Sequence, residues 1–115
     1  MLRAALWKAG LRYRKNDSTL PGKPDLVFRR PRVAVFCDGD FWHGRQWLER
    51  KRKLQRGHNP DYWIAKIEGN MERDTAVADA LVDAGWIVVR VWESDIKSDV
   101  NKVVKRIRTA IETRG

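Results

Sequence analysis

Two short apolar runs separated by four residues decide the fold: DLVF at residues 25–28 and VAVFC at residues 33–37. Both runs are rich in β-branched and aromatic residues, and the intervening RRPR (residues 29–32) contains a proline that favours a turn. The pattern predicts two strands joined as a hairpin. A third run, WIVVRVW at residues 86–92, is apolar almost throughout and predicts a central strand covered on both faces.

Segments with helical spacing of apolar residues surround these strands. Residues 2–9 have apolar side chains at positions i, i+3, i+4 and i+7, which predicts a short helix. Asn59 and Pro60 make a favourable helix start, and regularly spaced apolar residues continue a long helix to Gly85. The order of elements predicts one α/β domain over residues 1–115, with helices flanking a sheet. A final helix is expected after Ser94 or Ser98, with an apolar stripe of Val100, Val103, Val104, Ile107 and Ile111.

The composition describes a basic, folding chain. The 115 residues include 24 Lys and Arg against 15 Asp and Glu, so the net charge is +9. Apolar residues make up 43%, which excludes an intrinsically disordered chain. No apolar run approaches the roughly 20 residues that span a bilayer, and the N-terminus does not resemble a secretory signal, so we expect a cytoplasmic protein with no membrane contact. The positive charge favours a polyanionic partner, above all nucleic acid, although basic residues also serve solubility.

The strongest charge run covers residues 45–58, which contain a single acid, Glu49. One interpretation is a solvated surface. The other is a strip that contacts DNA phosphates and releases their counterions. The basic residues of the run are Arg45, Arg50, Lys51, Arg52, Lys53 and Arg56.

Two acids, Asp25 and Asp38, bracket the predicted hairpin. Antiparallel pairing would bring them together, and carboxylate and carbonyl oxygens at such a junction suit Mg²⁺. His43 follows five residues later as a candidate general base, so this segment holds the components for phosphodiester hydrolysis. Turn-forming acids and an ordinary loop histidine are the alternative interpretation. The adjacent Phe41 and Trp42 point in different directions, which favours at least one exposed aromatic ring that can wedge between bases.

Taken together, these segments resemble a known family. The blocks LPGKPDLV (residues 20–27), VFCDGDFWHG (35–44), YWIAKIEGN (62–70) and ERD (72–74), with the GW and VWE of residues 85–93, closely resemble the very-short-patch-repair (Vsr) DNA mismatch endonucleases. The resemblance implies the restriction-endonuclease-like fold of the PD-(D/E)XK superfamily, a mixed sheet flanked by helices. It also implies a Mg²⁺-dependent endonuclease that nicks DNA 5′ of the mispaired T at T:G mismatches.

The resemblance implies roles for individual residues. Asp25 matches the catalytic aspartate that binds Mg²⁺, and Cys37 stands where a backbone carbonyl reaches the metal, so its thiol need not matter. Asp38 stands where the family has His or Asp, and His43 matches the histidine proposed to act through water. These assignments make Asp25, Asp38 and His43 the predicted catalytic residues.

Further residues are predicted to bind DNA. Phe41, Trp42 and Trp63 match aromatic residues that intercalate beside the mismatch. The remaining predicted DNA contacts are Lys23, Arg50, Lys51, Arg52, Lys53 and Arg73, and we expect the basic run and the C-terminal helix to hold the DNA backbone. Lys66, Asn70, Arg73 and Asp74 match a helical motif whose individual roles the sequence does not assign.

The sequence departs from the family in two places. Many members bind a structural zinc, but the corresponding positions here are Asp40, Arg45, Trp47 and Ser94, which do not make a tetrahedral site, so we expect no zinc. Family members also carry an acidic residue on the first helix, whereas no acid precedes Asp17. Either the chain is shortened or that contribution is absent, and full activity is then in doubt.

The expected partner is double-stranded DNA, bound by a monomer associated with the nucleoid of a bacterial cytoplasm. Contacts with mismatch-repair factors follow only by analogy with the family. Two other functions remain open. One is a Vsr-like nuclease without mismatch specificity, of restriction, phage-defence or homing type. The other is a DNA-binding module that has lost catalysis.

Overall fold

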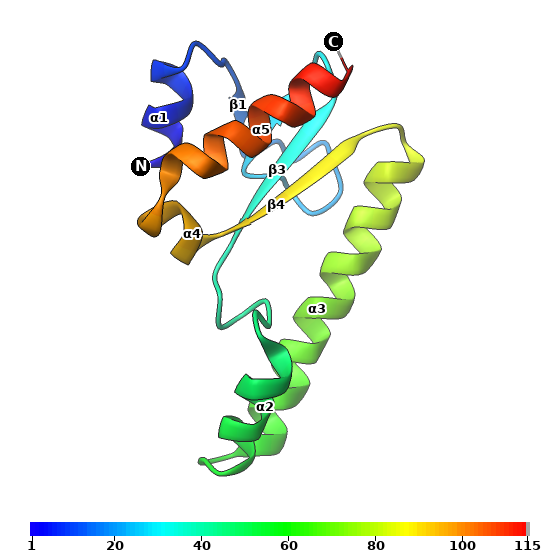
Figure 1. Cartoon of the computed structure of the whole chain (residues 1–115). Helices are drawn as coiled ribbons and strands as arrows, with labels where there is room; N and C mark the ends of the chain where they lie inside the picture. The colour runs from blue at the N-terminus through cyan, green and yellow to red at the C-terminus, as the bar shows by residue number, and fades with distance from the viewer. Residues whose placement is uncertain (115) are drawn as a thin grey trace.

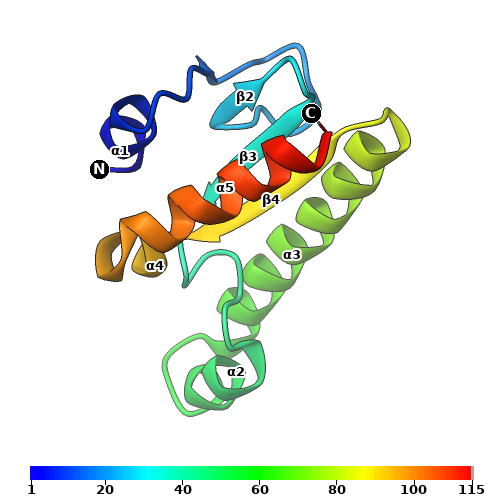
Figure 2. The same cartoon turned by 45° about the horizontal axis from the view of Figure 1, so that its top comes forward.

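The computed structural model describes residues 1–114 as a mixed four-stranded sheet with helices on both faces (Figures 1 and 2). The strand order is β1-β2-β3-β4, with the first two pairs antiparallel and β3 parallel to β4. The α/β class, the mixed sheet and the predicted hairpin are confirmed. The elements are α1 (Leu2–Lys8), β1 (Arg14–Lys15), β2 (Leu26–Phe28), β3 (Val33–Asp38), α2 (Trp47–Gln55), α3 (Pro60–Asp83), β4 (Ile87–Trp92), α4 (Glu93–Ser98) and α5 (Val100–Arg114).

The two faces of the sheet are covered by different helices. Alternate residues of a strand point to opposite faces. On one face, Val35 and Val89 pack with α1 and α5 in the larger apolar cluster, whose members include Ile107. On the other face, Ala34 and Phe36 pack with Leu81 of α3. Side chains at even positions of β3 and β4 therefore face α3.

One strand lies elsewhere than predicted. The run at residues 86–92 was expected to form a central strand, but β4 is an edge strand of the sheet, and β2 and β3 are central. This prediction was wrong because burial by helices and burial by neighbouring strands leave the same apolar pattern. α3 and α5 both contact β4, so the strand is apolar on two faces although it has one strand neighbour.

The predicted helices are present, with additions. The long helix begins at Pro60 and ends before Gly85, as expected. The last helix follows Asp99 rather than either serine, and the Asp99 carboxylate accepts a hydrogen bond from the Lys102 amide at 3.3 Å. The sequence did not predict β1, α2 or α4. Each is short or strongly charged, so apolar periodicity gives little signal.

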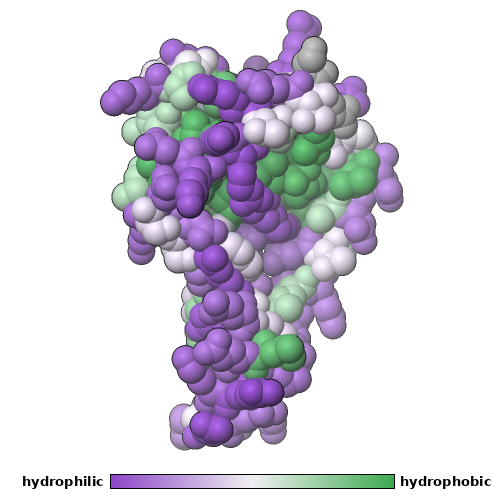
Figure 3. Space-filling view, in the orientation of Figure 1, coloured by the Kyte–Doolittle hydropathy of each residue, from purple (hydrophilic) through white to green (hydrophobic). Residues whose placement is uncertain are grey.

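Helices α2 and α3 form an arm that extends beyond the sheet (Figure 1). The molecule measures 47 × 31 × 21 Å, and the visible surface of the arm is largely hydrophilic (Figure 3). Within residues 1–114, no helix combines the length and the apolar character needed to cross a membrane. The arm joins the sheet through the upper part of α3, and the predicted catalytic residues lie at this junction.

Candidate active site

A pocket of about 370 Å³ lies between the α3 face of the sheet and α3 itself. Among the residues singled out from the sequence, the predicted catalytic and DNA-binding residues that line it are Lys23, Asp25, Asp38, His43 and Arg73. Its wall also includes Phe36, Cys37, Asp74, Val77 and Arg90. The hairpin, the segment after β3 and the long helix thus bring the predicted catalytic residues into one cavity.

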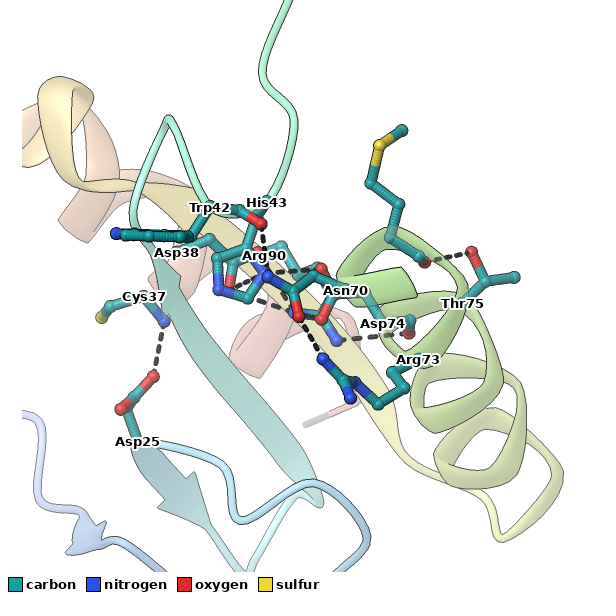
Figure 4. Close-up of polar contacts among 11 residues, drawn as sticks. Asp25, Cys37, Asp38, Trp42, His43, Asn70, Arg73, Asp74, Thr75 and Arg90 are labelled. Carbon is teal, nitrogen blue, oxygen red and sulfur yellow. Dashed lines mark hydrogen bonds and ion pairs between the residues drawn. The ribbon is translucent and has the colours of Figure 1, made fainter. Parts of the chain in front are cut away.

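The loop before β2 sits directly on α3. Gly22 has φ +74°, and a Cβ at this position would lie 2.5 Å from Cγ1 of Val77. Only glycine fits both the backbone conformation and the close approach. The loop delivers Asp25 to the start of β2, where its Oδ2 accepts a hydrogen bond from the Cys37 amide at 2.7 Å (Figure 4).

His43 is paired with a carboxylate of α3 (Figure 4). Its Nδ1 lies 2.6 Å from Oδ2 of Asp74 and 3.9 Å from Oδ1 of Asp38. An ionised carboxylate only accepts hydrogen bonds, so Nδ1 is the donor, and Nε2 is the ring nitrogen that is not engaged by Asp74. Gly44, at φ +74°, lets the chain pass Met71 of α3, because a Cβ there would lie 2.5 Å from the methionine sulfur.

Asp38 is almost fully buried, with 4% of its surface exposed. Both of its carboxylate oxygens lie 3.1 Å from Nη1 of Arg90. Burial raises the pKa of the Asp38 carboxyl above its ordinary value, while the Arg90 charge acts in the opposite direction. Arg90 was not predicted as a site residue from the sequence. The only signal was one charged residue inside an apolar strand.

The donor atoms beside Cys37 fit a hard divalent cation. Asp25 offers a carboxylate and Cys37 a main-chain carbonyl, and Mg²⁺ binds through one or two carboxylates while keeping several waters. Burial raises the pKa of the Cys37 thiol to about 11, with Asp25 and Asp38 adding to the shift. The thiol therefore stays protonated at neutral pH and is a poor ligand.

A second group of donor atoms, from Asp38, His43 and Asp74, lies within 4.8 Å of one another. Here the Arg90 guanidinium already supplies the positive charge, 3.1 Å from Asp38 and 3.6 Å from Asp74. This group suits proton handling better than cation binding.

An aromatic cluster lies next to the pocket, where the segment after β3 meets the arm. The ring centroids of Phe41 and Trp42 are 5.0 Å apart, and Trp63 lies 6.0 and 5.8 Å from them, respectively. Trp42 is 43% exposed, as the adjacency of two aromatic residues predicted for at least one of them. Two cations lie over this cluster: Lys66 is 5.4 Å from the Trp42 ring and Arg50 is 5.2 Å from the Phe41 ring.

The helical motif left unassigned by the sequence connects the cluster to the pocket (Figure 4). Asn70 donates a hydrogen bond to the Trp42 carbonyl at 2.9 Å. Arg73 in turn donates to the side-chain oxygen of Asn70 and lines the pocket, while Asp74 holds His43. The motif therefore positions both the aromatic segment and the histidine from a single helix.

Polar contacts join three of the four positions at which the sequence predicted that no zinc is bound, Asp40, Arg45 and Ser94. Arg45 lies 3.2 Å from Asp40 and 3.1 Å from Asp95, and the Ser94 amide donates to Asp40 at 3.1 Å. A guanidinium among these carboxylates does not fit a zinc ion, which needs four good ligands. Trp47 begins α2.

The basic run forms α2 and the turn that follows it. Arg52 and Lys53 are exposed, and Lys51 lies 3.6 Å from Glu68 of α3. The C-terminal helix was also expected to hold the DNA backbone. α5 packs on the opposite face of the sheet from the pocket, and its contact with DNA stays a prediction.

Comparisons with known proteins show which family the chain resembles. The family model for DNA mismatch endonuclease Vsr matches residues 1–49. The chain is 46% identical over 114 residues to the type II nicking enzyme V.HpaIIP of Haemophilus parainfluenzae, covering 99% of this chain and 79% of that protein. The chain belongs to the Vsr family. It is a DNA endonuclease, from a family whose members depend on a metal.

Other relatives of this Vsr family chain include a second type II nicking enzyme and a DNA mismatch endonuclease. The type II nicking enzyme V.NmeDIP of Neisseria meningitidis serogroup C is 42% identical over 113 residues, covering 98% of this chain and 75% of that protein. The DNA mismatch endonuclease Vsr of Escherichia coli K12 is 35% identical over 96 residues, covering 84% of this chain and 60% of that protein.

Proposed function

We propose that this Vsr family chain nicks one strand of duplex DNA 5′ of the mispaired T at T:G mismatches, with Mg²⁺ as cofactor. The observation that carries the proposal is the partly exposed aromatic cluster of Phe41, Trp42 and Trp63 directly beside a pocket that contains Asp25 and His43. A mismatched step is opened at lower cost than a paired one, so aromatic side chains that enter the stack favour mismatches.

Each of these pocket residues has a role in the proposed hydrolysis. Asp25 and the Cys37 carbonyl would hold Mg²⁺, which supplies Lewis-acid polarisation of the phosphate. His43 accepts the proton of the attacking water at Nε2, because Asp74 engages Nδ1. Lys23 and Arg73, which also line the pocket, attract the phosphate. Asp38 belongs to the same catalytic set through its contacts with Arg90 and its nearness to His43.

DNA binding away from the pocket is assigned to the arm. Arg52 and Lys53 are exposed on α2, and Lys51 and Arg50 lie beside them on the same helix. These contacts would be independent of base sequence and sensitive to salt. We also propose that residues 1–115 form one domain and that the protein acts as a monomer. Its proposed location is the bacterial cytoplasm, where it would act on the DNA of the nucleoid.

The test compares two end-labelled duplexes that differ only in T:G or T:A at one position, with Mg²⁺ present. We expect nicking 5′ of the mispaired T with a preference of about tenfold or more, which corresponds to about 1.4 kcal/mol. Trp42→Ala should lower the rate on the T:G duplex about tenfold, because base stacking on an aromatic ring contributes about 1–3 kcal/mol. Trp7→Ala, at another exposed tryptophan on α1, is the matched control and should change nothing.

One alternative function is supported by a specific observation. V.HpaIIP and V.NmeDIP are named type II nicking enzymes. Equal nicking of the T:G and T:A duplexes would favour a nuclease targeted by sequence rather than by a mismatch. Binding of both duplexes with no cleavage in Mg²⁺ or Mn²⁺ would favour a DNA-binding module without catalysis.

A further inference from the structure

A partly buried arginine, with 25% of its side chain exposed, lines the pocket (Figure 4). Arg90 occupies the middle of β4, in the sequence IVVRVW, and its guanidinium lies 4.2 Å from the centroid of the Phe36 ring. Burying a cation costs free energy unless it is paired, so its partners define its role.

Arg90 connects three elements of the fold. Nη1 lies 3.1 Å from both oxygens of Asp38 at the end of β3, and 3.6 Å from Oδ1 of Asp74 on α3. Nη2 donates a hydrogen bond to the main-chain carbonyl of Asp74 at 3.3 Å. Both terminal nitrogens therefore make contacts within the protein.

The same two carboxylates surround His43. Asp74 Oδ2 is 2.6 Å from Nδ1 of the imidazole, and Asp38 Oδ1 is 3.9 Å from it. Two carboxylates this close repel each other, and the guanidinium between them offsets that repulsion. Without Arg90, Asp38 would be a buried unpaired anion, and Asp74 would lose two of the contacts that fix it.

We propose that Arg90 is a positioning residue of the nicking reaction: it clamps Asp38 and Asp74 so that the imidazole of His43 is held with Nε2 toward the attacking water. Asp38 acts through Arg90 in this arrangement, as the partner that keeps the guanidinium in place. The inference rests on the proposed nicking function and adds to it a residue that does not touch the substrate.

The kinetic test uses Arg90→Gln and Arg90→Lys, with Arg30→Gln, at an exposed position of the turn between β2 and β3, as the matched control. Single-turnover nicking of the T:G duplex is measured at saturating protein, and DNA affinity is measured separately without Mg²⁺. We expect Arg90→Gln to slow nicking about 10–100-fold with affinity unchanged, because misplacing a catalytic group by about 1 Å can cost that much. Arg90→Lys should recover part of the rate, since it restores one charge without the fork.

A double variant that removes both charges separates the positioning role of Arg90 from its effect on the stability of the fold. Asp38→Asn with Arg90→Gln removes both charges together, so the unfolding midpoint should return toward that of the unsubstituted chain. We expect nicking to stay slow, because Asp74 and His43 are still not clamped. A double variant that regains both stability and nicking rate would overturn the inference.

The third measurement needs neither DNA nor metal. The chain has two histidines, His43 and the exposed His58, so imidazole ¹H–¹⁵N spectra give one site signal and one internal reference. We expect Arg90→Gln to shift or broaden the His43 Nδ1–H signal and to leave His58 unchanged. An unaltered His43 signal would overturn the positioning role. A chain that nicks neither duplex would instead contradict the proposed function, and the spectra would still decide whether Arg90 orders His43.

Discussion

On the α5 face of the sheet, Val35, Val89 and Ile107 are buried among apolar neighbours, whereas the α3 face of the same strands carries Asp38 and Arg90. The alternation of side chains along β3 and β4 separates the two environments by a single residue step. Apolar burial on the first face lowers the free energy of the folded state, while burying charges on the second face costs free energy. Apolar packing on the α5 face, here called the apolar face, therefore stabilises the strands. The α3 face of the same strands, here called the polar face, carries the charged side chains.

The largest expected effect is on the polar face, at Asp25. Asp25→Asn keeps the shape of the side chain but removes the charge that would hold the metal. We expect nicking to fall about a thousandfold, corresponding to the several kcal/mol that a metal contributes to transition-state stabilisation. DNA affinity measured by fluorescence anisotropy should stay within about twofold, because phosphate contacts come from other residues. An unchanged nicking rate in Asp25→Asn would show that the polar face does not hold the metal through Asp25.

The contribution of the apolar face to stability is tested at Ile107, which is fully buried. Ile107→Ala should lower the free energy of unfolding by about 2–5 kcal/mol in a urea titration, because the deletion leaves a cavity. The nicking rate of the remaining folded protein should not change. Lys105→Ala, at an exposed position of the same helix, should stay within about 0.5 kcal/mol. A loss of catalysis in folded Ile107→Ala would mean that the faces are coupled.

A smaller effect is expected at Asp74, which orients His43 but would not touch the phosphate. Asp74→Asn should slow nicking about 10–100-fold, as for other residues that orient a ligand or base from behind. His43→Ala combined with Asp74→Asn should be no slower than His43→Ala alone, because the two residues act as a unit. Asp79→Asn, at an exposed position of the same helix, is the matched control. Additive losses would separate Asp74 from His43.

The smallest effect on activity is expected at Cys37, since its proposed contribution comes from the main chain. Cys37→Ser should nick at the rate of the unsubstituted chain. The thiol pKa is raised from 9.0 to about 11, so the folded state holds its proton more tightly than the unfolded state. Its contribution to stability is present below pH 9 and is lost as the pH rises toward 11. Denaturation curves without divalent metal should show this alkaline loss in the native chain and not in Cys37→Ser.

The sequence predicted the parts of the fold that depend on apolar periodicity. The hairpin, the helix from Pro60 and the buried stripe of the last helix all appear where expected. The edge position of β4 could not be predicted, because a strand covered by helices on both faces looks like a central one. Helix α2 was not predicted either, since its charged residues leave little apolar pattern.

The candidate site was predictable in its residues but not in its pairings. Asp25, Asp38 and His43 were placed in one site by the order of two strands and a short loop, and they do line one pocket. Asp74 follows His43 by 31 positions, and Arg90 follows Asp38 by 52, so no local pattern connects them. Such long-range ion pairs become visible only when α3 and β4 are packed against β3.

The long helix also sets a rotational relationship between recognition and catalysis. Trp63 and Asp74 are eleven residues apart on α3, close to three full turns, so they project from the same side about 16 Å apart along the axis. Ile67 and Asn70 complete this stripe at helical spacing. One residue inserted between Trp63 and Asn70 would turn the ring by about 100° away from the pocket. The Trp63 ring and the Asp74 carboxylate that contacts His43 therefore stay in register through helical phase.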